Sequence, residues 1–197
     1  MNSILDIIGS VIVYGLLTVA LITVSANLTT SSVETKSAFH SEQNLLALYH
    51  FFEYDFLKIG LGKTNPKLKV GACDSLKIAW YSDYDENGKM DSIMYSMENI
   101  QTVNRGTFTK EVKQKPIFRQ LNNENPIEMH LDIVNFNLTY LDANSNVLPY
   151  DSLRTVTGTN KVRGIRVRYL IEDSYSVKEP PQRVFIEKTY YPKNLLY

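Results

Sequence analysis

The residues between positions 83 and 91 have the types and the spacing that could hold a calcium ion. They read D-x-D-x-N-G-x-x-D, which matches the first nine positions of a calcium-binding loop. In such a loop, side-chain oxygens and one backbone carbonyl surround the ion, because Ca²⁺ prefers six to eight oxygen ligands. The pattern predicts a Ca²⁺ site formed by Asp83, Asp85, Asn87, the carbonyl of Lys89, and Asp91.

The same segment also has the composition of a plain turn. Asp and Asn side chains accept hydrogen bonds from nearby backbone amides in turns, and Gly88 suits a left-handed backbone conformation. Met94 stands where a calcium loop carries its closing Glu, and no helices are predicted on either side, so the segment is not a standard EF-hand. Both interpretations are open from the sequence, and Ca²⁺ is the cofactor that the sequence suggests.

No catalytic motif accompanies this loop. The sequence contains no G-x-S-x-G, H-E-x-x-H, P-loop or dinucleotide-binding motif, and its three His and one Cys allow few nucleophilic arrangements. The carboxylates of Glu53 and Asp55 lie in a helical pattern, where we expect them on a solvated helix face. We therefore expect that the protein is not an enzyme.

The composition limits the classes of partner. Lys and Arg together number 21, as do Asp and Glu, so the chain of 197 residues carries no net charge at pH 7. Without an excess of basic residues we expect no binding to nucleic acid. Cys73 is the only cysteine, which excludes an internal disulfide and a cysteine-rich zinc site.

One carboxylate stands at the head of an apolar segment. Asp6 precedes residues 7–25, which carry no charge and, as a helix, are long enough to cross the roughly 30 Å hydrocarbon core of a bilayer. Three interpretations are open: a cleaved signal peptide, a plain membrane anchor, and a helix that assembles with neighbouring subunits. A signal peptide would begin with basic residues, whereas the nearest basic residue here is Lys36, which also leaves the positive-inside rule without an orientation.

Two accounts of Asp6 are open. In the first, Asp6 lies at the membrane edge, where its charge interacts favourably with the dipole of the helix N-terminus. The second is an assembly helix. An unpaired carboxylate among packed apolar helices is costly, so it would pair with the N-terminal amine of a neighbouring subunit. That pair would set the axial register between subunits.

The helical pattern continues past the apolar segment. Residues 27–41 contain no Pro or Gly, and Gly60 and Gly62 are the first signals that end a helix. We predict one helix over about residues 3–59, roughly 85 Å long, whose second half packs on a globular domain. Large apolar side chains at helical spacing would form the packed face: Leu45, Leu48, Phe52, Phe56 and Ile59.

The rest of the chain is predicted to be antiparallel strands. Residues 127–142 are predicted as one long strand with a β-bulge at Val134 and Asn135, where the apolar alternation slips by one position. Four further strands show apolar alternation, and the acidic loop joins the first two as a hairpin: 75–82, 92–97, 162–171 and 184–190.

These elements predict an α+β fold, in which a long, partly transmembrane N-terminal helix packs on an antiparallel β-sheet domain. The helix would span residues 1–60, with a membrane or filament-core half at 3–26 and an amphipathic half at 27–60. Residues 61–197 would form the β-rich globular domain.

Several stretches resemble the type IV pilin and type II secretion pseudopilin superfamily. Mature members carry an acidic residue at the fifth position of an apolar helix, which is the position of Asp6 once Met1 is removed. Other stretches resemble the J-type and W-type minor pseudopilins in the end of the long helix, a strand and turn, the penultimate strand and the closing segment: residues 56–62, 136–144, 162–169 and 189–195.

The resemblance implies a structural subunit of a type IV pilus-like filament or a type II secretion pseudopilus, with a minor or tip position favoured. Its partners would be other pilin or pseudopilin subunits, contacted through the N-terminal helix. The chain would sit in a bacterial inner membrane as a single-pass protein with its globular domain extracytoplasmic, and then enter a periplasmic or cell-surface filament. The alternative from the sequence is a membrane-tethered extracytoplasmic binding module that does not assemble.

Overall fold

The computed structural model describes residues 2–62, 65, 67–97, 101–104, 111–114, 116–129, 133–172 and 183–196. A single helix, α1 (Asn2–Leu57), accounts for the first part of the chain. It contains no Pro, and the chain leaves it through turns in which Gly60 and Gly62 adopt φ values of 75° and 70°. The predicted long helix and its glycine end are confirmed.

Strands and short helices follow α1 along the described chain. The strands are β1 (Lys77–Ser82), β2 (Asp91–Met97), β3 (Gln101–Asn104), β4 (Glu111–Gln114), β5 (Ile117–Leu121), β6 (Ile127–Met129), β7 (Ile133–Leu141), β8 (Val147–Leu148), β9 (Gly164–Glu172) and β10 (Arg183–Tyr190). The short helices are η1 (Tyr150–Arg154), α2 (Val156–Thr159) and η2 (Lys193–Leu195).

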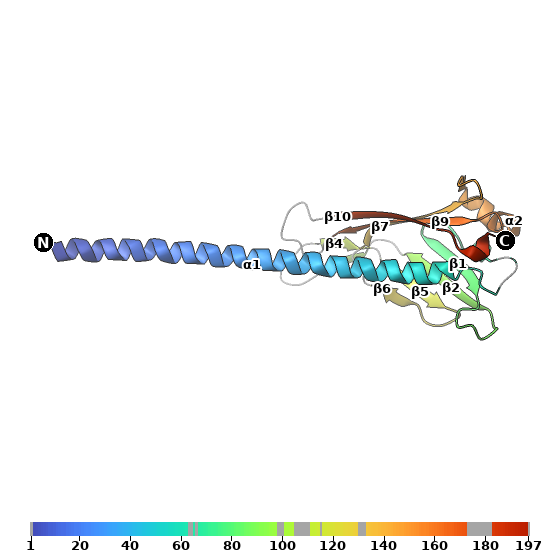
Figure 1. Cartoon of the computed structure of the whole chain (residues 1–197), viewed down its shortest axis with the longest axis horizontal. Coiled ribbons are helices and arrows are strands. Elements are labelled where there is room, and N and C mark those ends of the chain that lie inside the picture. The colour runs from blue at the N-terminus through green and yellow to red at the C-terminus, as the bar shows by residue number, and fades with distance from the viewer. Residues whose placement is uncertain are drawn as a thin grey trace.

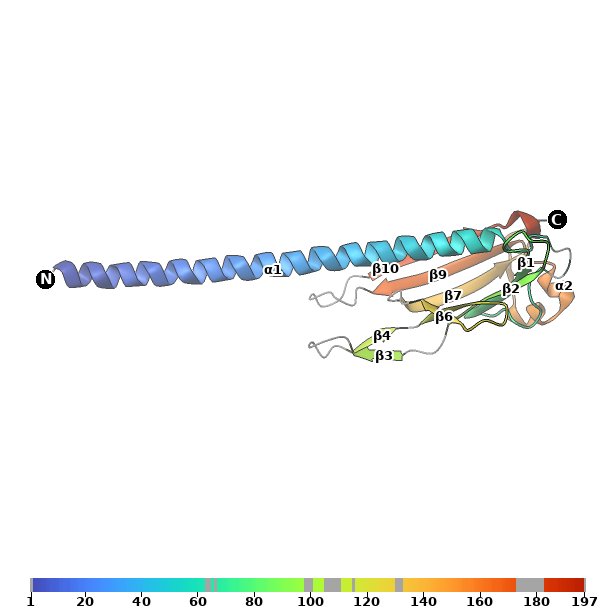
Figure 2. The same ribbon diagram turned by 90° about the horizontal axis from the view of Figure 1, so that it is seen from below.

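Two four-stranded antiparallel sheets and one hairpin form the β domain. The first sheet has the order β1-β2-β5-β6 and the second the order β10-β9-β7-β8, while β3 pairs with β4. The two larger sheets lie on either side of the second half of α1 (Figure 1). In the perpendicular view, α1 runs along one side of the domain and the β3–β4 hairpin lies on the other (Figure 2). The predicted α+β class is confirmed.

Aromatic rings of α1 hold the two sheets together. Phe52 contacts Tyr95 of the first sheet at a ring-centroid distance of 5.3 Å, and Tyr169 of the second sheet at 6.2 Å. Phe56 likewise meets Trp80 of the first sheet at 5.5 Å and Tyr190 of the second at 5.2 Å. Because both Phe side chains are fully buried, the second half of α1 forms the centre of the hydrophobic core.

The predicted strand over residues 127–142 is divided between the two sheets, and its continuity depends on residues 130–132, which lie outside the described residues. Its first part is β6, which pairs with β5 in the first sheet, and its second part is β7, which pairs with β9 in the second. The chain passes from one sheet to the other between them. The predicted bulge is confirmed, because the β7–β9 register shifts between Ile133 and Asn135, and the shift turns Phe136 and Leu138 into the core.

Candidate functional site

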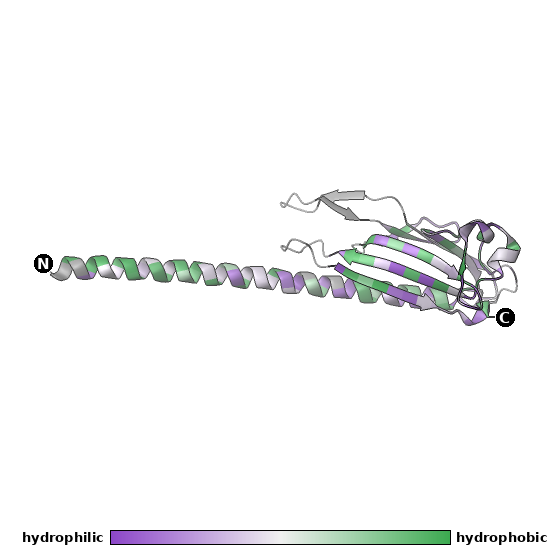
Figure 3. Cartoon of the chain, turned by 90° about the horizontal axis from the view of Figure 1, so that it is seen from above, coloured by the Kyte–Doolittle hydropathy of each residue, from purple (hydrophilic) through white to green (hydrophobic). Residues whose placement is uncertain are grey.

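The first half of α1 contacts nothing else in the described chain. Among the described side chains of this half, the large apolar ones from Ile7 to Leu28 are each between 52% and 75% exposed. This half extends away from the β domain, and hydrophobic residues recur along its length (Figure 3). At 100° per residue, its exposed apolar residues fall on all sides of the helix. The helix is long and apolar enough to cross a membrane, by length and composition. A helix that is apolar all round requires lipid or other protein around it.

Several Ser and Thr hydroxyl groups in this part of α1 are hydrogen-bonded within the helix. Ser10, Thr18 and Thr23 each donate to the backbone carbonyl four residues earlier, at 2.8 to 2.9 Å. Farther along, Thr29 and Thr30 do the same. A hydroxyl that already donates to the backbone can lie in an apolar environment at little cost in free energy. These residues therefore do not interrupt the apolar surface.

Asp6 lies in this exposed half, and its side chain is exposed. Its backbone carbonyl accepts the hydrogen bond from Ser10. The next charged residue along the helix is Glu34, so Asp6 is the first of two charged residues separated by about seven uncharged helical turns. The predicted pairing of Asp6 with a neighbouring subunit stays a prediction.

The second half of α1 has two apolar faces. One face carries Leu48, Phe52 and Phe56 and is buried in the β domain. On the other side, large apolar side chains remain about half exposed: Phe39, Leu46, Phe51, Tyr54 and Leu57. We call these five residues the outer stripe. At 100° per residue, Tyr54 and Leu57 lie roughly 160° and 140° around the helix from Phe52, on the side away from the β domain.

A buried ion pair fixes α1 to the first sheet. The Asp55 side chain is 1% exposed and the Arg119 side chain, from β5, is 16% exposed. Arg119 Nε donates to Asp55 Oδ2 at 2.6 Å, and its Nη2 donates to Oδ1 at 3.4 Å. The Tyr95 hydroxyl donates to the same Oδ2 at 2.6 Å. The predicted solvated position of Asp55 is therefore wrong: a helical pattern locates a carboxylate on a face but does not reveal an arginine 64 residues away.

Aromatic rings and cations enclose this pair. The Arg119 guanidinium lies 5.3 Å from the centroid of the Tyr84 ring, and Lys58 Nζ lies 4.8 Å from the same ring. Burial, followed by the negative charge of Asp55, raises the pKa of Tyr84 to about 12 and that of Tyr95 well above its usual value. Burial opposes the charge on Arg119, but the hydrogen bonds to Asp55 and the negative charge of Asp55 together outweigh this cost and raise the pKa of Arg119.

The acidic loop connects β1 and β2 and is held by its own side chains. Asp83 Oδ2 accepts a hydrogen bond from the Gly88 amide at 3.0 Å, and Asp85 Oδ2 accepts one from Asn87 Nδ2 at 2.6 Å. The Asn87 side chain in turn accepts the Lys89 amide at 2.8 Å. Asp91 Oδ2 accepts the Tyr84 amide at 3.2 Å. These are the interactions expected of a turn.

The described residues do not include three His, Cys, Asp or Glu side chains grouped as metal ligands. The carboxylates of Asp83, Asp85 and Asp91 instead bond different parts of the loop. A site that also used the Asn87 and Lys89 oxygens would have to replace several of these hydrogen bonds with bonds to the ion. Calcium binding by this loop stays a prediction.

The exposed helix and the buried pair that orients it are thus the features with the clearest functional consequence. The described chain combines a helix with no partner in its first half, a two-faced second half, and a β domain fixed rigidly to that helix. Comparisons of the chain with models of protein families, with curated proteins and with solved structures found no match.

Proposed function

We propose that this protein is a structural subunit of a pilin-like filament: a type IV pilus-like filament or a type II secretion pseudopilus, in a minor or tip position. The observation that carries the proposal is the outer stripe on α1. The proposal also rests on the resemblance of the sequence to pilins and minor pseudopilins, and on a long helix whose second half is docked on a β domain.

The outer stripe favours assembly because a membrane cannot cover it. About 20 helical residues span the hydrocarbon core, so a span that begins at Ile7 ends near Ala26. Phe39 lies about 20 Å farther along the helix, and Leu57 about 45 Å farther. A tether would need apolar side chains only within the bilayer. Apolar side chains on both faces beyond it are suited to packing between the β domain and the helices of neighbouring subunits.

Apolar burial would supply most of the assembly energy, at about 25 cal/mol for each Å² removed from water or headgroups. Burial alone does not fix how far one helix slides along another. In the proposed filament, Asp6 fixes this register by pairing with the N-terminal amine of a neighbouring subunit. Before assembly the chain would be held in a bacterial inner membrane by the first half of α1, with the β domain extracytoplasmic.

The first experiment measures where the chain is found. Filaments are sheared from cells that express it, purified and analysed by quantitative mass spectrometry. The proposal expects the chain in the filaments, at trace stoichiometry for a minor or tip subunit and at high stoichiometry for a main one. A chain found only in the membrane fraction would overturn the proposal in favour of a tethered binding module.

A variant pair tests the outer stripe directly. Changing both Phe39 and Leu46 to Ser should remove the chain from filaments while leaving it in the membrane and its β domain folded. The matched control is Gln43→Ser, an exposed polar residue on the same stretch of helix. Equal incorporation of the two variants would contradict the role assigned to the stripe.

A further inference from the structure

A polar pocket lies at the end of the molecule opposite the free end of α1. Its lining comes from the segment before β1, from α2 and the turn after it, and from η2: Asn65, Lys67, Thr159, Asn160, Val162, Arg163 and Leu195. The pocket has a volume of about 210 Å³. Because α2 and the C-terminus lie at the far end from the N-terminus, this pocket stays accessible when the first half of α1 is embedded (Figure 1).

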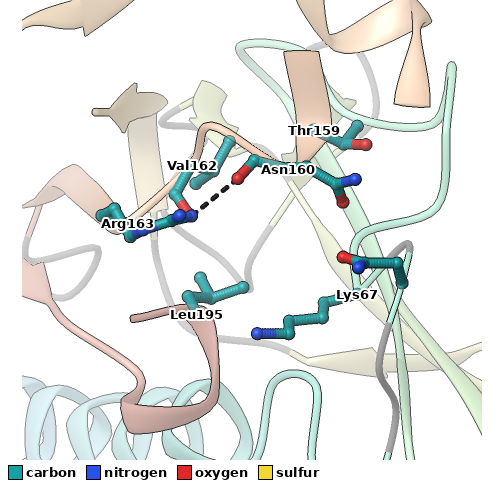
Figure 4. A pocket seen from close by; sticks show the side chains of 7 residues that line it. Lys67, Thr159, Asn160, Val162, Arg163 and Leu195 are labelled. Carbon is teal, nitrogen blue, oxygen red and sulfur yellow. Dashed lines mark hydrogen bonds between the residues drawn. The ribbon is translucent and has the colours of Figure 1, made fainter. Parts of the chain in front are cut away.

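Two cations face this pocket and no acidic residue is among its described lining. In the close-up view, Arg163 and Lys67 extend into the pocket from opposite sides (Figure 4). Burial, followed by the positive charge of Arg163, lowers the pKa of Lys67. Two positive charges that oppose each other in a partly enclosed space are stabilised when an anion lies between them.

Both cationic side chains are held in position. The carbon chain of Lys67 packs against Gly60, where an added Cβ would lie 3.0 Å from it. Arg163 Nη1 donates to the carbonyls of Asn160 and Val162, at 2.6 and 3.0 Å. These bonds fix the guanidinium plane, and the remaining nitrogens, Nε and Nη2, have no hydrogen-bond acceptor among the described residues.

A third observation indicates a polar occupant. The side-chain oxygen of Asn160 is buried and has no hydrogen-bond partner in the described structure. A buried acceptor without a donor is energetically unfavourable, so such an atom calls for a water or ligand that donates to it. The volume admits a polyatomic anion together with a few waters, but it is smaller than the roughly 300 Å³ typical of drug-sized ligands.

We propose that this pocket binds a small oxyanion group, a carboxylate or a phosphate, between Lys67 and Arg163. A carboxylate would come from an acidic peptide or sugar acid, and a phosphate from a phosphorylated ligand. We expect inorganic phosphate to bind more tightly than acetate, because a protonated phosphate oxygen can donate to Asn160 while its other oxygens accept from the two cations. The proposal is independent of filament assembly.

The test is an NMR titration of the isotope-labelled full chain in detergent micelles. Inorganic phosphate and acetate are added separately, with sodium chloride at matched ionic strength as the reference. The proposal expects saturable shifts in the side-chain amide signals of Asn65 and Asn160 with at least one of the two anions. Tighter binding of phosphate indicates a phosphorylated ligand and tighter binding of acetate a carboxylate ligand, and either order supports the proposal.

Variants distinguish anion binding in this pocket from general effects of salt. Lys67→Gln should weaken binding about tenfold or more, because it removes one charge-assisted hydrogen bond and keeps the packing on Gly60. Arg163→Lys retains the charge but not the planar donors, and should weaken binding less. Lys69→Gln is the matched control, since it removes the same charge two residues away and outside the pocket. Shifts that do not saturate, or that are equal in Lys67→Gln and Lys69→Gln, would overturn the proposal.

Discussion

The two halves of α1 form one continuous helix, but they differ in the contacts that stabilise them. In the second half, Phe52 and Phe56 are fully buried among rings from both sheets, and Asp55 is paired with Arg119. In the first half, the large apolar side chains that the structure describes are all exposed. The second half therefore obtains its stability from its own domain, whereas the first half requires an environment that the chain itself does not provide.

The largest expected difference between the halves is in the loss of unfolding free energy when an apolar side chain is truncated. Phe56→Ala should lower the free energy of unfolding of the β domain by about 3–5 kcal/mol, since it removes a buried ring between Trp80 and Tyr190. Leu17→Ala, in the exposed half, should change it by less than about 0.5 kcal/mol. Urea unfolding in detergent, followed by the fluorescence of the single Trp, measures both. Equal losses would show that the two halves are not energetically distinct.

The next largest effect concerns the buried ion pair. Arg119→Met should destabilise the domain by about 3 kcal/mol, because it leaves the Asp55 carboxylate buried without its cation. Adding Asp55→Leu to this variant should restore most of the loss, apart from about 1 kcal/mol for the Tyr95 hydroxyl left without its acceptor. The same unfolding measurement tests both variants. A double variant no more stable than the single one would contradict this account of the pair.

Alkaline pH should lower the free energy of unfolding of the β domain and the half of α1 docked on it, but should not affect the first half. Burial and the charge of Asp55 raise the pKa of Tyr95 above its usual value of 10, so the fold favours the neutral hydroxyl. The unfolded chain loses that proton near pH 10 and the folded chain does not. The stabilisation is therefore complete below pH 10 and is lost as pH rises from there toward the folded pKa.

For Tyr95 alone the loss should reach about 1.4 kcal/mol at about pH 11. Tyr169 and Tyr190, whose pKa values burial also raises, add to it in the same direction. Unfolding midpoints measured from neutral to alkaline pH, together with tyrosinate absorbance, test the prediction. Ionisation of all tyrosines near pH 10 without unfolding would contradict it.

A smaller effect is expected in the acidic loop, which lies outside both halves of α1. Asp91→Ala should cost about 1 kcal/mol, because Asp91 accepts hydrogen bonds from the Tyr84 amide and from the Asn122 side chain. Asp85→Ala should cost less, since its partners are exposed. Thermal unfolding with and without added Ca²⁺ then tests the predicted metal site. A calcium-dependent rise in Tm that Asp85→Ala abolishes would support it, and the same Tm with and without Ca²⁺ would favour the plain turn.

The smallest effect on stability is expected at Asp6, a residue of the exposed half for which folding and assembly should respond differently. Asp6→Ala should leave the unfolding of the β domain and membrane insertion unchanged, because the side chain is exposed and distant from the core. In the proposed filament it should nevertheless impair assembly, as measured by the amount of chain in sheared filaments. Asp6→Glu is the matched control, since it keeps the charge. Normal assembly of Asp6→Ala would remove the register role.

Sequence patterns predicted the parts of the fold that depend on neighbouring residues. Helical spacing gave the docked face of α1, strand alternation gave β1, β2, β9 and β10, and the slip in alternation located the bulge in β7. Partners distant in sequence were not predictable in this way. The pairing of β6 and β7 in different sheets depends on partners distant in sequence, and the burial of Asp55 depends on Arg119 in a strand that the sequence did not reveal. The polar pocket, too, joins three segments that no local pattern connects.

The unbroken length of α1 has a mechanical consequence. The helix runs from Asn2 to Leu57 without Pro, about 84 Å, and one end is held by edge-to-face aromatic contacts and an ion pair. No hinge lies between the two ends. A push, a pull or a twist applied to the first turns would therefore be transmitted along the helix and move the β domain as a rigid body. Force on the helix would thus displace the far end of the domain and any ligand bound there.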